Sequence, residues 1–111
     1  MSRVPVTAVA AYIRSKNAGP FRLTLDILFK DRAVYEHVKA TRQVTPDLVA
    51  QLYRVPPDQI TDFVCFDPGK AIKITMRRPT SSGSPGDTDV YGAQQHAPLL
   101  AIEFELPDRL A

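Results

Sequence analysis

The 111-residue chain has a single cysteine, Cys65, and its 14 basic and 12 acidic residues nearly balance. One cysteine excludes an intramolecular disulfide and the paired-cysteine motifs of zinc sites. A formal charge of +2 gives no reason to expect a polyanionic partner such as nucleic acid. Cys65 lies in the apolar run of residues 63–66, which favours a buried, inert thiol over a nucleophile.

Residues 1–16 lack the apolar run of a secretory signal or a membrane helix, because Arg3, Pro5 and Arg14 interrupt them. We therefore expect a cytoplasmic protein with no membrane partner. The length suits one domain over residues 1–111. Its 44% apolar and 23% charged residues are ordinary for a globular protein, so composition favours no special class.

The sequence also has no complete catalytic constellation. No nucleophile lies beside a base, and no two carboxylates are spaced for hydrolysis. The Gly-Lys-Ser/Thr ending of a Walker loop is missing as well. We therefore expect no metal ion and no cofactor, and we expect the chain to be a poor enzyme by itself.

Three helices are predicted. Apolar residues within 6–13 follow the i, i+3, i+4, i+7 spacing of a short amphipathic helix. An aspartate can cap a second helix over residues 31–42. A Thr-Pro pair at residues 45–46 marks the start of a third helix, which ends before the prolines at 56–57.

Four strands are predicted. Residues 21–30 alternate between apolar and polar, as a half-buried strand does. Residues 60–66 form a largely apolar run that suits a central strand, which an Asp-Pro-Gly turn joins to an antiparallel strand over 72–77. Residues 100–106 form the last strand. The residues expected to share one core are Phe21, Leu23, Leu25, Ile27, Phe29, Val64, Ile72, Ile74, Leu100, Ile102 and Phe104.

These elements predict an α+β fold. We expect a four-stranded, mostly antiparallel sheet with helices packed on one face. A ferredoxin-like order of strands is one arrangement that fits.

Residues 81–96, SSGSPGDTDVYGAQQH, carry almost no apolar side chains but hold three of the five glycines. A loop of this length is uncommon in a compact domain and is usually functional or disordered. Its varied polar composition differs from a simple linker, so we interpret it as a site or an interface. The residues expected to contact a substrate or a partner are Ser84, Gly86, Asp87, Asp89, Tyr91, Gln94, Gln95 and His96.

Several chemistries suit this loop. Its serines with Gly83 and Gly86 resemble a backbone nest for phosphate. Asp87 and Asp89 could instead ligate a hard cation, although the other ligands of an EF-hand are missing. His96 is the better candidate for an acid or base of the two histidines, with a hydrogen-bonded loop histidine as the alternative.

A cationic turn precedes the first predicted strand. Its residues are Arg14, Ser15, Lys16, Asn17, Ala18 and Gly19. Arg14 can hold a carboxylate or phosphate with two hydrogen bonds, and Gly19 lets the backbone approach a ligand. We expect Arg14, Ser15, Asn17 and Gly19 to bind an anionic substrate, and we expect this turn to lie near residues 81–96. The alternative is a solvated helix end with cations at the negative end of the dipole.

Asp26 falls on the face of its predicted strand opposite the apolar stripe. If a partner covers this face, the carboxylate needs a cation, and Arg14, Lys73 or Arg77 could serve. If the face is open, Asp26 is simply hydrated.

Three segments resemble the small AtuA-related proteins: RSKNAGPFRLTLDI, FDPGKAIKITMRRP and SGSPGDTDVYGAQQHAPLL. The resemblance covers nearly the whole chain. More distantly, residues 14–19 resemble the RSGDKG turn that opens the C-terminal ferredoxin-fold domain of the acyclic terpene utilisation (AtuA) proteins. Arg14, Ser15 and Gly19 match that turn, whereas residues 16–18 replace Gly-Asp-Lys and remove its acidic group.

This resemblance implies a partner and a reaction class. The small proteins look like a detached C-terminal domain of a large AtuA-type chain and are often encoded beside one. The implied function is a non-autonomous subunit of a heteromeric complex that hydrates or dehydrates carboxylic acids or acyl-CoA thioesters. A free-standing homo-oligomeric module that binds a small anion is the alternative, and a self-sufficient enzyme using His96 ranks third.

Overall fold

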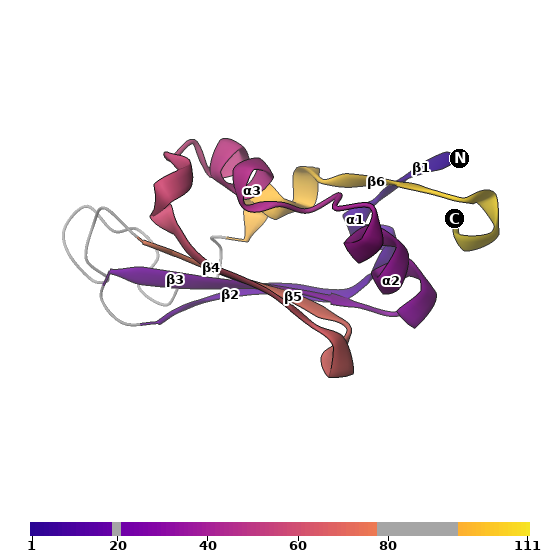
Figure 1. Ribbon diagram of the computed structural model, residues 1–111, viewed down its shortest axis with the longest axis horizontal. Helices are drawn as coiled ribbons and strands as arrows, with labels where there is room; N and C mark the ends of the chain where they lie inside the picture. The colour runs from indigo at the N-terminus through magenta and orange to yellow at the C-terminus, as the bar shows by residue number, and fades with distance from the viewer. Residues whose placement is uncertain (19–20, 78–95) are drawn as a thin grey trace.

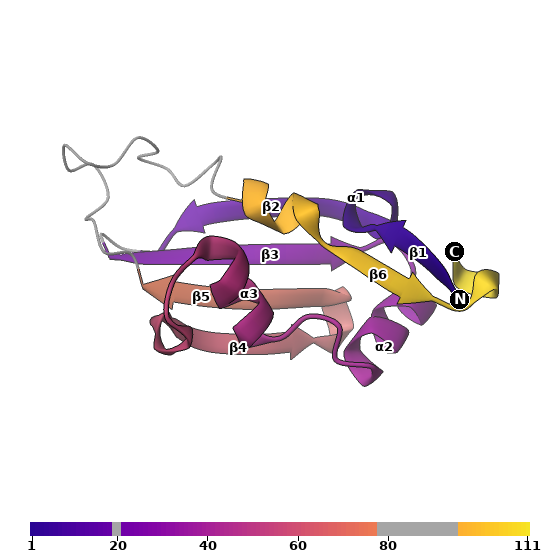
Figure 2. The same ribbon diagram turned by 90° about the horizontal axis from the view of Figure 1, so that it is seen from above.

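The computed structural model describes residues 1–18, 21–77 and 96–111, which form two antiparallel sheets (Figures 1 and 2). The larger sheet has the strand order β2 (Ala10–Asn17), β3 (Arg22–Phe29), β5 (Ala71–Arg77), β4 (Ile60–Phe66). A separate ribbon pairs β1 (Ser2–Pro5) with β6 (Glu103–Leu106). The predicted α+β class and four-stranded antiparallel sheet are confirmed.

One face of the larger sheet carries all the helices. These are α1 (Val6–Val9), α2 (Arg32–Ala40) and α3 (Pro46–Tyr53), and the β1–β6 ribbon lies on the same side (Figure 1). Short 3₁₀ turns occupy Pro57–Gln59, Asp67–Gly69, Ala97–Ala101 and Asp108–Leu110. In the described part of the chain, no helix or strand covers the opposite face, so that face is open.

The two longer helices begin at the predicted caps. Asp31 Oδ1 accepts a hydrogen bond from the Ala33 amide at 2.8 Å, and Thr45 Oγ1 accepts one from the Leu48 amide at 3.1 Å. Each cap satisfies an amide that has no partner within its own helix. The caps therefore set where α2 and α3 begin over the sheet.

One apolar core fills the space between the sheet, the helices and the ribbon. Leu25 and Ile74 are paired across β3 and β5 and are fully buried, which confirms the predicted strand register. Phe21, Val64 and Leu100 were wrongly predicted as core residues, since they are 56%, 50% and 43% exposed. Phe21 precedes β3, Val64 points to the open face and Leu100 lies in a 3₁₀ turn. The other predicted core residues are buried: Leu23, Ile27, Phe29, Ile72, Ile102 and Phe104.

Residues 10–17 form a strand, whereas the sequence predicted the end of a helix over 6–13 and then a turn from residue 14. Only the single turn of α1 is helical, and the chain then pairs along β3 from Ala10 opposite Phe29 to Asn17 opposite Leu23. Without this pairing, the N–H and C=O groups along that edge of β3 would have no strand partner. Pairing across the sheet therefore overrides the local helical pattern. It also removes the predicted helix end beside Arg14.

Two predicted strands occupy different places from those expected. β4 lies at an edge of the sheet and not at its centre, although its antiparallel hairpin with β5 is confirmed. β6 pairs with β1 and does not join the larger sheet, whose other edge is β2. β3 and β4 are parallel with β5 between them, and this is the split βαβ unit of ferredoxin-like folds. Because β2 precedes this unit in the chain, a complete ferredoxin-like order is not confirmed.

Candidate functional site

A row of charged side chains crosses the centre of the open face. Arg14 of β2 pairs in register with Asp26 of β3, which pairs with Lys73 of β5. The Nε of Arg14 donates a hydrogen bond to Oδ2 of Asp26 at 3.0 Å. This bond raises the pKa of Arg14 above its ordinary value, so the guanidinium is charged at any physiological pH. Of the three cations that the sequence offered as partners for Asp26, Arg14 is the one that binds it.

Asp26 is buried although it lies on the open face. Its second oxygen, Oδ1, is inaccessible to solvent and has no hydrogen-bond partner among the described residues. Burying a carboxylate oxygen without a donor costs free energy. A donor from a ligand or a second chain would remove that cost.

A cavity of about 360 Å³ surrounds this row, and its lining consists of Arg14, Lys16, Thr24, Asp26 and Lys73. Three cations and one carboxylate leave a net charge of +2 in the cavity. A guanidinium can hold a carboxylate or phosphate with two hydrogen bonds, and lysine adds a mobile charge. The cavity therefore suits a small anion.

Exposed apolar side chains flank the charged row. The guanidinium carbon of Arg14 lies 5.1 Å from the Tyr12 ring centroid, and Lys73 Nζ lies 5.6 Å from the Phe66 ring centroid. Both distances allow a cation–π attraction. Tyr12, Val64 and Phe66 are each about half exposed. Rings and arginine together on an exposed face are typical of an interaction surface.

We call this surface the open sheet face. It is formed by Tyr12, Arg14, Lys16, Thr24, Asp26, Lys73, Val64 and Phe66.

The structure divides the predicted cationic turn between the two faces of β2. Arg14 and Lys16 lie on the open sheet face, whereas Ser15 and Asn17 face the helices. Ser15 is buried. Successive side chains of a strand point in opposite directions, so Arg14 lies on the other side of the sheet from Ser15 and Asn17. Substrate binding by these three residues stays a prediction.

His96 immediately precedes the 3₁₀ turn Ala97–Ala101, and its carbonyl oxygen accepts a hydrogen bond from the Leu99 amide at 2.9 Å. The remaining predicted site residues lie outside the described residues: Gly19, Ser84, Gly86, Asp87, Asp89, Tyr91, Gln94 and Gln95. The expected proximity of residues 81–96 to residues 14–19 therefore stays a prediction.

Thr24 and Lys73 line the cavity but were not among the predicted ligands. The sequence predicted no role for Thr24 and predicted Lys73 only as a possible partner for Asp26. Both occupy polar positions of alternating strands, which is the signal that marks the open face. That signal shows which face a residue occupies but not which strand lies beside it. The sequence does not show that β3 and β5 are neighbours, so it could not predict this cluster.

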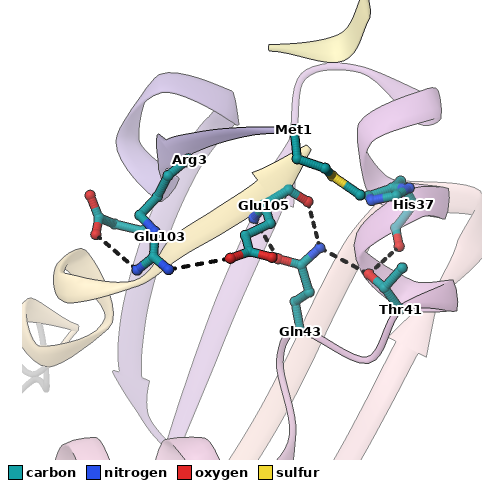
Figure 3. Close-up of a pocket in the computed structure, with 7 residues that line it drawn as sticks. All are labelled: Met1, Arg3, His37, Thr41, Gln43, Glu103 and Glu105. Carbon is teal, nitrogen blue, oxygen red and sulfur yellow. Dashed lines mark hydrogen bonds and ion pairs between the residues drawn. The ribbon is translucent and has the colours of Figure 1, made fainter. Parts of the chain in front are cut away.

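A second cavity, of about 390 Å³, lies between the β1–β6 ribbon and α2 (Figure 3). Gln43 Nε2 donates to the Glu105 carbonyl at 2.8 Å, and its Oε1 accepts from the Glu105 amide at 2.7 Å. The Gln43 amide thus continues the pairing of β6 on the side away from β1. Arg3 forms ion pairs with Glu103 at 3.7 Å and Glu105 at 3.3 Å. We interpret this cavity as part of a structural network.

Asp67, in the turn between β4 and β5, is a third polar centre. Tyr35 Oη donates to Oδ1 at 2.6 Å, and Lys39 Nζ donates to the two carboxylate oxygens at 2.9 and 3.0 Å. The hydrogen bonds from Tyr35 and Lys39 lower the pKa of Asp67. Burial, followed by the bond to Asp67, raises the pKa of Tyr35. This cluster joins α2 to the β4–β5 turn.

Within residues 1–18, 21–77 and 96–111, no three His, Cys, Asp or Glu side chains gather closely enough to hold a metal ion. No helix in these ranges has the length and apolar character needed to cross a bilayer. Cys65 is a partly buried free thiol, and burial raises its pKa.

A family model described as a domain of unknown function, DUF4387, matches residues 6–103, which reach from α1 to the first residue of β6. No curated protein and no solved structure matches the chain. None of these comparisons bears on the resemblance to AtuA proteins. Because the family match covers most of its length, the chain belongs to the DUF4387 family.

Proposed function

We propose that this chain is a small, non-autonomous cytoplasmic subunit of an AtuA-type heteromeric complex in the catabolism of carboxylic acids or acyl-CoA thioesters. The proposed reaction is hydration or dehydration. The reaction class comes from the resemblance of the sequence to AtuA-related proteins. In this proposal the chain contributes part of a site, and a larger chain completes it.

The observation that carries the proposal is the unpartnered Oδ1 of Asp26 on the open sheet face. None of the described residues supplies a donor to this buried oxygen. A second chain on this face would cover Tyr12 and Phe66 and could present an N–H or cationic group to Asp26. Exclusion of water would also strengthen the attraction between Arg14 and Asp26, because the local dielectric constant falls.

An anionic substrate would lie at the junction of the two chains. Arg14 and Lys73 flank Asp26, and with Lys16 they exceed its charge by two. A substrate carboxylate there would gain charge-assisted hydrogen bonds. In the proposal, residues 81–95 supply further substrate or partner contacts, and His96 is the acid or base.

The alternative is a free-standing homo-oligomer that binds a small anion, and the same cations support it. Two copies that met through this face in a symmetric dimer would place Arg14, Lys16 and Lys73 of one chain against the same residues of the other. Like charges opposed across an interface destabilise it. The charge of the open sheet face therefore favours a partner of different sequence that carries acidic groups.

The test is co-purification with a large AtuA-type chain from the same genome, followed by hydratase assays on candidate acids with each chain omitted. We expect a stable complex, and turnover only when both chains are present. Arg14→Ala should weaken assembly or turnover. Val64→Asp should prevent assembly, because it places a like charge against an acidic partner.

Arg3→Ala provides the matched control, since Arg3 forms its ion pairs in the ribbon, away from the open sheet face. This variant should assemble and turn over normally. Full turnover by the small chain alone would contradict the proposal. So would a stable homo-oligomer that binds the acid without a partner.

A further inference from the structure

A third cavity, of about 440 Å³, lies on the helix side of the larger sheet. It opens between the end of α2, the start of α3 and the inward face of the edge strand β4; Figure 2 shows these elements side by side. Val38, Val44, Phe63 and Ile72 make its lining mainly apolar. A volume of this size is within the range of small-molecule sites.

Two cations, Lys39 and Arg42, stand at this cavity. Lys39 is already bound to Asp67, at 2.9 and 3.0 Å. The Arg42 side chain makes no ion pair and no hydrogen bond with any residue that the structure describes. Arg42 is exposed at the rim of an apolar cavity, and its guanidinium can therefore bind a ligand.

The backbone of Arg42 lies in the left-handed region, as do those of Arg54 and Lys70 among the described residues. Arg42 follows the C-cap Thr41 of α2 and has a φ of 52°, in the left-handed region. Glycine is the usual residue at this place after a helix, because a side chain is strained there. The chain thus keeps a charged side chain at a position where its backbone would favour glycine.

None of the residues that line this cavity is acidic, so none repels an anion. Cys65 also lines it, and burial raises the pKa of this thiol, so the sulfur is neutral at physiological pH. The carboxylate of Asp67 is neutralised by Lys39. Phe63 and the neighbouring aliphatic side chains offer contacts only to a hydrocarbon.

We propose that this cavity binds a carboxylic acid with a hydrocarbon body. The guanidinium of Arg42 binds the carboxylate at the rim with paired hydrogen bonds, for which its planar fork is suited. The hydrocarbon packs against Val38, Val44, Phe63 and Ile72 and loses its contact with water. The site lies on the opposite side of the sheet from the open sheet face, so it does not depend on the proposed complex.

The experiment uses the full chain and sodium octanoate as the probe, with octanamide as a neutral ligand of equal length. Calorimetric titration should show saturable binding of one octanoate per chain. Octanamide should bind about tenfold more weakly, since it lacks the charge-assisted bond to Arg42. Backbone NMR shifts caused by octanoate should cluster at Val44 and Phe63.

Arg42→Gly is the decisive variant, because glycine relieves the positive φ while removing the guanidinium. It should lose about tenfold in octanoate affinity, keep its octanamide affinity and unfold at a temperature no lower than the unmodified chain. Arg54→Gly is the matched control, since Arg54 also has a positive φ, of 56°, but does not line the cavity. It should bind octanoate normally.

Equal affinities for octanoate and octanamide would overturn the proposal, as would octanoate binding that survives in Arg42→Gly. Loss of octanoate binding in Arg14→Ala with full binding in Arg42→Gly would move the anion to the open sheet face and also overturn it. These outcomes concern the isolated chain, so they are distinct from a failure to co-purify with a large partner.

Discussion

The Nε of Arg14 lies 3.0 Å from Oδ2 of Asp26, yet the two side chains differ greatly in exposure. The side chain of Arg14 is 57% exposed and that of Asp26 is 11% exposed. Removal of Asp26 would leave a cation that water can hydrate. Removal of Arg14 would leave a buried carboxylate that has lost its hydrogen-bond donor.

We therefore predict unequal effects from matched substitutions of this pair. Arg14→Val should lower the thermal unfolding temperature by more than Asp26→Val does. The double variant should lower it by less than the sum of the two single changes, because the residues interact directly. Thermal unfolding followed by circular dichroism measures all three. A larger loss for Asp26→Val would show that the carboxylate is satisfied without Arg14.

Truncation of a core side chain and of a side chain on the open sheet face should change the free energy of unfolding by different amounts. Leu25→Ala removes a fully buried side chain from β3 and should lower the free energy of unfolding by about 2–5 kcal/mol. Val64→Ala, on the open sheet face, should lower it by less than about 0.5 kcal/mol. Urea unfolding of the isolated chain gives both values. Comparable losses would mean that the open face is covered in the isolated chain.

The lowered pKa of Asp67 leads us to expect that the folded chain loses stability in acid. Because Tyr35 and Lys39 lower the pKa of this carboxyl in the folded chain, the unfolded chain takes up the proton first as the pH falls. The linked stability is complete above the ordinary pKa of 3.8 and is lost as the pH falls through the lower folded-state value. Tyr35→Phe should raise the folded-state pKa of Asp67 and make this loss smaller. Carboxyl NMR titration and urea unfolding across this pH range measure the two effects.

Tyr53→Phe is the control for this prediction. Burial raises the pKa of Tyr53, and Tyr53 is not among the residues that shift the pKa of Asp67. The titration of Asp67 should be the same in this variant as in the unmodified chain. An Asp67 titration that is unaffected by Tyr35→Phe would assign the lowered pKa to Lys39 and Arg32.

Loss of the N-cap of α3 should lower the free energy of unfolding by less than loss of the Leu25 side chain does. Thr45→Ala removes the acceptor of the Leu48 amide and should lower the free energy of unfolding by about 1 kcal/mol. Thr45→Ser keeps a hydroxyl in the same place and should retain most of that stability. Equal losses in both variants would show that the methyl group of Thr45, and not its hydroxyl, stabilises the helix start.

The elements that could be predicted from the sequence are those with local causes. Asp31 and Thr45 cap helices through residues two and three positions away. The alternation around Leu25 is likewise contained within β3. β2 could not be predicted, because Ser15 and Asn17 place polar side chains on its core side and weaken the alternation. Its strand conformation depends on pairing with β3.

The site was predictable only in part, for the same reason. Arg14 was identified from its charge and its neighbours in the chain. Lys73, which lines the same cavity on the open sheet face, belongs to a strand far away in the sequence. Arg42 gave no sequence signal, because its left-handed backbone and its place beside Phe63 arise only in the folded chain.

The β1–β6 ribbon has a consequence for how the chain folds. Ser2 pairs with Leu106, so this contact closes a loop that includes almost all of the 111 residues. Closing a long loop costs more entropy than closing the β4–β5 hairpin, whose strands are separated by one turn. During synthesis the hairpins can form while the chain is still growing, but β1 must wait for β6 to leave the ribosome. Phe104 and Leu106 are fully buried, so the core itself is completed last.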